Sequence, residues 1–267
     1  MTQLTFKRYE IKYQLTDEQR ARLEAVMSTY MVPDEYGPST VCNVYYDTPS
    51  SLLIRRSIEK PVYKEKVRVR SYGIRKPEDP VFLELKKKYD GVIYKRRATM
   101  TAERAAAFLA GKGDPQNQIE QELDFSIKRY GGLVPAAFIA YDREAFYAAD
   151  DHEFRMTFDR RVRYRTSDMN LTTGDAGTQI LPEGKNLLEV KCAGAMPLWL
   201  VHFFTEERIY KTSYSKYGCA YTCELEKRLA ARRARKDPAH MRVVVPQRRS
   251  VPTRAPRHAY NLSRAAF

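Results

Sequence analysis

The sequence lacks any apolar run long enough to cross a membrane. Its longest apolar stretch, from Met196 to Phe204, is about half of the roughly 20 residues that a spanning helix needs. The N-terminus also lacks the succession of basic, apolar and small residues that marks a secretory signal. It leads directly into strand-like alternation. We therefore expect a cytoplasmic protein without a transmembrane segment.

Cysteine and histidine are scarce, with four of each in 267 residues. Four cysteines in a chain of this length do not form a disulfide framework. Cys219 and Cys223 have the i, i+4 spacing of one helix face, which is compatible with a metal site, but burial as small apolar side chains is the better interpretation. The histidines occur singly, and no phosphate loop of the GxxxxGK[ST] type is present. The sequence therefore gives no histidine-based metal motif and no P-loop.

Acidic residues are scarce at one end of the chain only. From Lys227 to Phe267 there are twelve lysines and arginines against Asp237 alone, so this end supplies most of the net charge of +14. We predict one folded domain over residues 1–236 and a flexible, Pro- and Arg-rich basic tail over residues 237–267. Such a tail suits polyphosphate, nucleic acid or an anionic membrane surface, because attraction of this kind is largely independent of sequence. A tail with no dedicated partner is the alternative, and we expect no sequence-specific nucleic-acid partner.

Alternation of apolar and polar residues predicts eight strands, over residues 4–15, 41–47, 63–72, 81–89, 91–100, 138–147, 154–164 and 187–192. Asp90-Gly91 predicts a tight antiparallel hairpin between two of them. Helical patterns cover residues 17–31, 50–57, 101–110, 118–130 and 216–235, and Thr16 is the expected cap of the first. These elements predict an α+β fold, a closed or nearly closed eight-stranded antiparallel β-barrel with helices packed outside.

Three of the predicted strands contain the pattern Glu-x-Lys, at Glu10, Glu84 and Glu189. Side chains of a strand alternate between its faces, so each glutamate shares a face with the lysine that follows it. Further basic residues extend these charged faces: Arg8, Lys64, Lys66, Arg68, Arg70, Lys88, Lys95 and Arg97.

The opposite faces of these strands are apolar, as at Leu83, Val67 and Leu188, and must be covered. If helices outside the barrel cover them, the charged faces line a tunnel. The alternative is an apolar barrel interior with the charged faces in solvent, which is the usual meaning of such alternation. Recurrence of the pattern on several strands favours the tunnel.

A cationic tunnel suits polyphosphate or a nucleoside triphosphate, because arginine and lysine neutralise phosphate through charge-assisted hydrogen bonds. Carboxylates repel phosphate, so the glutamates need another role. They either hold a divalent cation that bridges to phosphate or keep the lysines in position by pairing with them. Phosphoryl transfer in such a site would rely on positioning and electrostatics, without a protein nucleophile.

Eight motifs occur in the order RYEIKY, YYDTP, KVRVRSYG, VFLELKKKYDGVIYKRR, YDREAF, TFDR, LLEVK and SKYG. Together they resemble the polyphosphate polymerase domain of the vacuolar transporter chaperone (VTC) family, bacterial type, over roughly residues 6–226. That family belongs to the triphosphate tunnel metalloenzymes, the CYTH-like superfamily, so the resemblance implies an eight-stranded tunnel barrel. It also implies a phosphotransferase that moves the γ-phosphate of ATP to the end of a growing inorganic polyphosphate chain, with Mn²⁺ or Mg²⁺ as cofactor and ADP as product.

The resemblance assigns roles position by position. The basic residues that match catalytic positions are Lys12, Arg68, Arg70, Lys86, Lys95, Arg143 and Lys216. Tyr141 and Ser215 match neighbouring phosphate contacts, and Glu189 matches the metal-binding glutamate. We add to the substrate-binding set the other charged residues of the same strand faces: Lys191, Arg8, Glu10, Glu84 and Arg97.

One departure from the superfamily pattern bears on the reaction. The hydrolytic branch begins with Glu-x-Glu-x-Lys, whereas Arg8 stands at the first acidic position here. This exchange removes a metal ligand and adds a phosphate ligand, which favours polymer synthesis over hydrolysis. The alternatives are a triphosphatase or polyphosphatase of the same fold and a non-catalytic polyphosphate-binding module. Eukaryotic relatives couple synthesis to translocation, so translocation by this chain would require a membrane partner protein.

Overall fold

The computed structural model describes residues 9–90 and 92–236. The chain divides into two units, residues 1–227 and 228–267, and the fold below is that of the first. Its strands are β1 (Tyr9–Thr16), β2 (Met31–Pro33), β3 (Ser39–Asp47), β4 (Tyr63–Tyr72), β5 (Val81–Tyr89), β6 (Val92–Met100), β7 (Val134–Ala148), β8 (Arg155–Arg165), β9 (Thr178–Gln179), β10 (Lys185–Cys192) and β11 (Lys211–Thr212). Its helices are α1 (Asp17–Met27), α2 (Leu52–Ile58), α3 (Ala102–Leu109), α4 (Gln118–Lys128), α5 (Leu198–Glu206) and the start of α6 (Lys216–Lys236).

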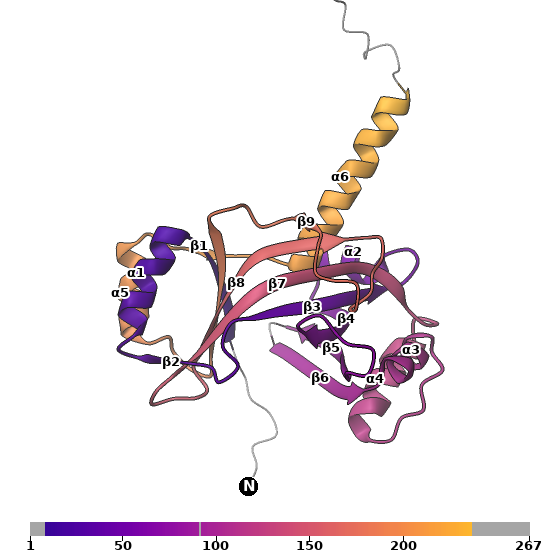
Figure 1. Cartoon of the computed structure of the whole chain (residues 1–267), viewed down its shortest axis with the longest axis horizontal. Helices are drawn as coiled ribbons and strands as arrows, with labels where there is room; N and C mark the ends of the chain where they lie inside the picture. Colours follow the sequence, from indigo (N-terminus) through magenta and orange to yellow (C-terminus); the bar gives the residue numbers. More distant parts are fainter. Residues whose placement is uncertain (1–8, 91, 237–267) are drawn as a thin grey trace, which may run out of the picture. The chain divides into compact units, whose positions relative to one another are not determined.

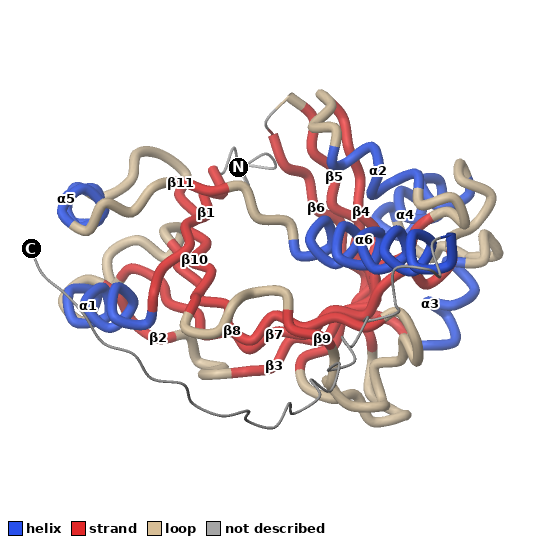
Figure 2. The backbone as a smooth tube through the Cα atoms, turned by 90° about the horizontal axis from the view of Figure 1, so that it is seen from above, coloured by secondary structure: helices blue, strands red, loops and turns tan. Residues whose placement is uncertain are grey.

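One sheet contains all the described strands, and its main path is β11-β1-β10-β8-β7-β3-β4-β5-β6 (Figures 1 and 2). Every pairing along this path is antiparallel. The eight predicted strands correspond to β1, β3 to β8 and β10. Asp90 has the positive φ of 42° expected of the predicted hairpin between β5 and β6. The antiparallel α+β architecture is therefore confirmed.

The sheet is not closed into a barrel, so the closed barrel predicted from the sequence is wrong. Among the described residues, β6 pairs only with β5, and the outer edge of β1 pairs with the short strand β11. The segment after β11 lies at this opening and contacts both sides of it. The Lys12 ammonium of β1 donates to the Tyr214 carbonyl at 3.1 Å, and Lys66 of β4 donates to the Ser215 hydroxyl at 2.8 Å. A chain segment and side chains thus take the place of a hydrogen-bonded ladder. Figure 2 shows the curled, open sheet.

Helices cover the apolar faces of the strands. Helices α3 and α4 pack on β4 to β6, where Phe108 and Leu123 join Val67 and Leu83 in one buried cluster. Helices α1 and α5 pack on β1, β8 and β10 in a second cluster. The glutamates and lysines of the Glu-x-Lys patterns on these strands point the other way. The alternative of outward-facing charged stripes is therefore wrong.

Not every helix packs outside the sheet, which is a second correction. Tyr217 and Ala220, in the first turns of α6, form a third buried cluster with Ile139 and Tyr141 of β7. By strand alternation these β7 residues lie on the face that carries Arg143, not on the face of Phe138, which belongs to the first cluster. The start of α6 therefore covers part of the charged face.

Two helix predictions differ from the structure. Helix α1 ends at Met27 instead of residue 31, because Met31 begins β2 and pairs with Ala148. The apolar run from Met196 to Phe204 contributes to α5, which the pattern did not predict and which buries Leu200, Phe203 and Phe204 against the sheet. Over residues 9–236, leaving Gly91 aside, no helix has both the length and the apolarity that crossing a bilayer requires.

Candidate active site

Charged side chains from both ends of the sheet path meet on one face, which we call the inner face. The ammonium group of Lys86, on β5, is 2.8 and 3.0 Å from the two carboxylate oxygens of Glu10, on β1. These strands lie near opposite ends of the sheet, so only its concave side brings them together. Lys86, Lys95 and Lys191 keep 37%, 42% and 31% of their side-chain surface exposed, so solvent reaches this face.

Glu84 is the centre of the first ionic cluster. The register of β4, β5 and β6 places Arg68 and Arg97 on either side of it. Arg68 Nε lies 2.7 Å from Oε2, whereas Arg97 Nε and Lys95 Nζ lie 2.6 and 2.9 Å from Oε1. Burial alone would raise the pKa of Glu84, which is 1% exposed, but the surrounding cations hold it well below its usual range. The ionised carboxylate fixes the guanidinium groups in place.

Asp159 is the centre of the second cluster. Arg143, its partner in the β7–β8 register, binds it through Nε and Nη2 at 2.6 and 2.8 Å. Lys216, at the start of α6, donates to the same carboxylate and lies over the ring of Tyr141. Asp159 is fully buried, yet Arg143 and Lys216 outweigh the effect of burial and lower its pKa to about 2. The sequence interpretation did not assign Asp159 a role, although alternation in TFDR places its side chain on the other face of the strand from the buried Phe158.

The third cluster joins β1 to β10, where Lys12 stands opposite Glu189 and Glu10 opposite Lys191. Lys12 Nζ is 3.6 Å from Glu189 and 3.8 Å from Glu10, and Lys191 Nζ is 3.0 Å from Glu189. Burial would lower the pKa of Lys12, but the two carboxylates raise it above its ordinary value. Burial would raise the pKa of Glu189, and the surrounding lysines with Arg143 hold it well below its ordinary value.

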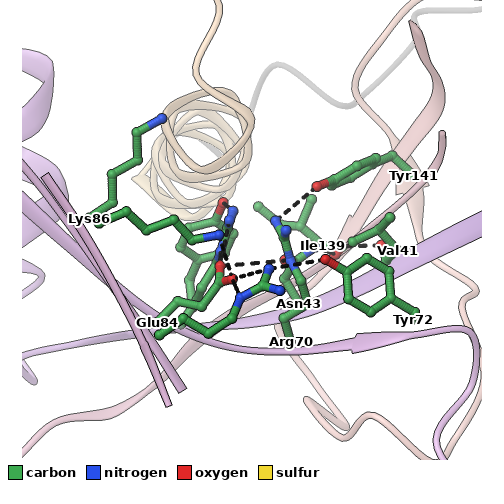
Figure 3. Close-up of polar contacts among 12 residues, drawn as sticks. Val41, Asn43, Arg70, Tyr72, Glu84, Lys86, Ile139 and Tyr141 are labelled. Atoms are coloured by element: carbon green, nitrogen blue, oxygen red, sulfur yellow. Dashed lines mark hydrogen bonds and ion pairs between the residues drawn. The ribbon is translucent and has the colours of Figure 1, made fainter. Parts of the chain in front are cut away.

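Arg70 connects the clusters through neutral partners (Figure 3). Its Nε donates to Asn43 at 2.9 Å and its Nη2 donates to the Tyr141 hydroxyl at 3.1 Å, while Glu84 lies 3.8 Å away. Asn43 is fully buried and donates to the Ile139 carbonyl. Burial would raise the pKa of Tyr141, but Arg143 and Arg70 lower it. Asn43 is uncharged and belongs to no recurring pattern, so no sequence signal could have identified it.

On β4, β5 and β6, the inner-face residues next to Arg68, Glu84 and Arg97 are lysines, and these lysines stand opposite one another. Lys66 of β4 pairs in register with Lys86 of β5, which pairs with Lys95 of β6. We call these three residues the lysine row. Burial is the main cause of the low pKa values of Lys66, about 7, and Lys95, about 8.

The predicted site residues that the structure describes all belong to this inner face or to the start of α6. Ser215 caps α6 by accepting from the Gly218 amide at 3.0 Å. Arg8 lies outside the described residues, as does the predicted tail over residues 237–267. Cys219 and Cys223 are half-buried on α6.

The inner face offers few metal ligands. In the part of the chain that the structure describes, no three His, Cys, Asp or Glu side chains are grouped to hold a metal ion. Glu189 and Glu10 both contact Lys12, so the two carboxylates lie near one ammonium group. Magnesium is often bound by one or two carboxylates, with water and substrate phosphate completing the shell. The donor set fits a cation of that kind, shared with phosphate.

Comparison with solved structures gives distant likenesses. A candidate adenylate cyclase from Bacillus halodurans shares 14% identity, with 78% of this chain and 95% of that chain covered and a TM-score of 0.49. A Hippeastrum protein, described as a candidate adenylyl cyclase with a dominant triphosphatase activity, shares 16% identity over 79% and 93% of the two chains, with a TM-score of 0.49. A candidate adenylate cyclase from Vibrio parahaemolyticus shares 13% identity over 81% and 98%, with a TM-score of 0.44. Likenesses at this level carry no argument about activity.

Curated proteins give no match to this chain. The family model described as the VTC domain matches residues 7–224. The match includes the elements from β1 to the first turns of α6 and contains all three ionic clusters. The chain therefore belongs to the VTC domain family.

Proposed function

We propose that this VTC-domain protein is a polyphosphate polymerase. It transfers the γ-phosphate of ATP to the end of a growing inorganic polyphosphate chain with the help of Mn²⁺ or Mg²⁺. The observation that supports this most is the convergence of arginines and lysines on one solvent-reached face, where buried carboxylates orient many of them. A chain of closely spaced negative charges is the ligand that such a face complements.

Arginines held by buried carboxylates form the fixed part of this phosphate grip. Arg143 uses Nε and Nη2 for Asp159, which leaves the donors of Nη1 for phosphate. Because Asp159 and Glu84 remain ionised, they keep the guanidinium groups oriented before substrate arrives. Preorganised charge of this kind stabilises negative charge in a transition state without reorganisation during the reaction.

The reaction requires little further chemistry from the protein. A terminal oxygen of polyphosphate, already ionised, forms a bond to the γ-phosphorus of ATP. The bond from that phosphorus to the oxygen bridging the β- and γ-phosphates breaks, and ADP leaves with that oxygen. The chain grows by one phosphate. Arg68, Arg143 and Lys216 would hold the reacting phosphates in line and neutralise the charge that develops on their oxygens.

A divalent cation would bind at Glu189, with phosphate oxygens and water as its other ligands. Its contribution would be to polarise the transferred phosphoryl group. Lys12 and Lys191 now pair with Glu189, so they would turn from the carboxylate toward phosphate as the cation binds.

The proposal extends to the organisation of the chain. Residues 1–236 would form the catalytic domain, and the basic segment 237–267 would contact polyanions. The reaction would take place in the cytoplasm, where ATP is available, and any export of the polymer would depend on a membrane partner protein.

Incubation of the purified chain with ATP and Mn²⁺ or Mg²⁺ tests the reaction. We expect long polyphosphate and one ADP for each phosphate incorporated. Orthophosphate without polymer would contradict the proposal in favour of a triphosphatase, and polyphosphate binding without turnover would leave a binding module. Arg97 and Arg96 are adjacent on β6 but face opposite sides, and Arg96 pairs with Glu122 of α4. Arg97→Ala should lower synthesis strongly, whereas Arg96→Ala should leave it within twofold.

A further inference from the structure

Lys66 lies in the middle of the inner face but has no role in the site derived from the sequence. It follows Lys64 and precedes Arg68 on that face of β4. Its Nζ donates to the Ser215 hydroxyl at 2.8 Å. The same hydroxyl accepts from the Gly218 amide at 3.0 Å and so caps the first turn of α6. Lys66 therefore lies beside the positive end of a helix.

Lys66 differs in its partners from the five lysines of the predicted site. Lys12, Lys86, Lys95, Lys191 and Lys216 each contact a carboxylate. Among the described residues, no carboxylate lies within ion-pair distance of Lys66, whose hydrogen-bond partner is the neutral Ser215.

The charged groups around Lys66 are mostly positive. They are Lys64 and Arg68 on its own strand, Lys86 on β5 and Lys12 on β1. Glu10, the carboxylate that contacts Lys12 and Lys86, is bonded to Lys86 at 2.8 and 3.0 Å. A largely desolvated cation among cations, beside a helix N-terminus, lacks the anion that would balance it.

We propose that Lys66 is an additional phosphate-binding residue, whose ammonium group pairs with a phosphate oxygen next to Ser215 and the start of α6. This inference rests on the proposed function, because it takes a triphosphate or polyphosphate as the ligand of the inner face. The phosphate supplies the negative charge that the protein does not place there, and helix N-termini favour such anions.

Phosphate binding at this position is coupled to uptake of a proton. In the empty site, burial and the neighbouring cations lower the pKa of Lys66 to about 7. A phosphate oxygen at hydrogen-bond distance stabilises the charged form and raises that pKa. At pH 8 the empty site holds Lys66 mostly neutral and the occupied site holds it charged, so uptake approaches about one proton. At pH 6 the lysine is charged in both states and takes up almost none.

Calorimetric titration of the full chain with tripolyphosphate, in EDTA to prevent turnover, measures this coupling. Buffers of different ionisation enthalpy give the protons taken up at pH 6 and pH 8. The variants are Lys66→Arg, which stays charged throughout, and Lys66→Met, which keeps the length of the side chain without its charge. Lys87→Met is the control, because Lys87 adjoins the lysine row on β5 but stands opposite Glu65 on the other face of the sheet.

We expect Lys66→Met to bind tripolyphosphate at least tenfold more weakly at pH 6, and Lys66→Arg to bind within threefold of the parent. Both variants should take up about one proton fewer than the parent at pH 8. Protons that tripolyphosphate itself gains or loses on binding are the same for all proteins, so they cancel when a variant is compared with the parent. Lys87→Met should behave as the parent. Removal of a cation from a cationic group should not destabilise the fold, so the melting temperature of Lys66→Met should equal or exceed that of the parent.

Affinity of Lys66→Met within twofold of the parent at pH 6 would overturn the inference, as would full proton uptake by Lys66→Arg. The experiments distinguish failure of this inference from failure of the proposed function. If tripolyphosphate binding depends on Lys66 but ATP yields no polymer, the proposed reaction fails while Lys66 remains a phosphate ligand. If polymer forms normally in Lys66→Met, the inference about Lys66 fails and the reaction stands.

Discussion

Two adjacent rows of the inner face carry similar positive charge but hold it in different ways. In the arginine row, Arg68 and Arg97 flank Glu84, which is 1% exposed and bonds to both. In the lysine row, like charges oppose one another across the strands, and Lys95 and Lys66 have lowered pKa values. Like charges directly opposite in a sheet are unfavourable.

The difference separates two kinds of phosphate contact. Guanidinium groups stay charged at all relevant pH values and are fixed by a carboxylate, so they are ready before the ligand arrives. Ammonium groups of low pKa gain or lose charge with their surroundings, so ligand binding changes their state. We infer that the arginine row orients phosphate and that Lys66 and Lys95 adapt their charge to it.

The largest expected effect on polymer synthesis comes from replacing an arginine of the first row by lysine, compared with replacing a lysine of the second row by arginine. Arg68→Lys keeps the charge but loses the paired contacts of Nε and Nη2 with Glu84, so we expect polymer synthesis to fall about 10²–10³-fold, the usual cost of losing one preorganised donor. The reverse exchange in the lysine row, Lys86→Arg, should change synthesis by less than about tenfold. Initial rates of ADP and polymer formation measure both variants. Equal losses in the two would remove the distinction between the rows.

Removal of the central carboxylate should destabilise the fold. Glu84→Gln leaves Arg68, Lys95 and Arg97 without their anion, and we expect the free energy of unfolding to fall by about 3 kcal/mol. That is the low end of the usual range, because Lys95 and Arg97 partly reach water. Chemical denaturation at pH 7 measures it, with Glu122→Gln as the matched control. Glu122 is 32% exposed in its pair with Arg96, so its loss should cost less than about 1 kcal/mol.

The same carboxylate gives a pH dependence of stability. The pKa of Glu84 is lowered by folding, so its contribution is fully present above its unfolded pKa near 4.5 and is lost as pH falls below that value. Glu84→Gln should lack this part of acid destabilisation. Denaturation curves of the two proteins at pH 7 and pH 3.5 should therefore lie closer together at the lower pH.

Lys66 and Lys95 should produce a dependence of the same sign at higher pH. Folding lowers the pKa of Lys66 to about 7 and of Lys95 to about 8, so between pH 7 and 9 the unfolded chain binds more protons than the folded one. Stability of the ligand-free protein should therefore rise over this range, by about 1–2 kcal/mol after allowance for the partial exposure of Lys95. In Lys66→Met the rise should be smaller. A fall in stability of the parent over that range would contradict the assignment.

The smallest expected effect is a gain in affinity for tripolyphosphate when Glu10 is replaced. Glu10 holds Lys86 at 2.8 Å and competes with phosphate for it. Glu10→Gln should therefore tighten tripolyphosphate binding in EDTA by about two- to fivefold, the worth of a partly exposed ion pair. Gln14→Glu is a useful counterpart, because it adds a carboxylate on the same side of β1 and should weaken binding. Calorimetry measures both, and weaker binding by Glu10→Gln would show that this carboxylate supports the ligand.

Local patterns predicted the long strands and missed the short ones. The eight long strands have enough alternating residues to be recognised, and their side-chain faces follow directly. Strand β2 has three residues and strands β9 and β11 have two each. Such short strands exist only because β7, β8 and β1 provide partners for them.

The candidate site was also predicted only in part, because only the residues that belong to a repeated pattern can be recognised in the sequence. The repeated Glu-x-Lys pattern identified Glu10, Glu84 and Glu189 with their lysines, whereas Asp159 and Asn43 lie in strands that lack this pattern. Lys66 was visible as part of the charged face of β4. Its lack of a carboxylate partner became apparent only once the strands were assembled.

The sequence by itself determined which side chains share a face, because alternation in a strand is a local property of the backbone. Only the tertiary structure decided that the charged faces are concave and that the sheet remains open. It also decided the ion pairs. Lys86 bonds to Glu10 of β1, although Glu84 is two residues away on its own strand, because Glu84 is already bonded to Arg68, Lys95 and Arg97. The curl of the sheet brings β1 within reach of β5, and no local pattern encodes that approach.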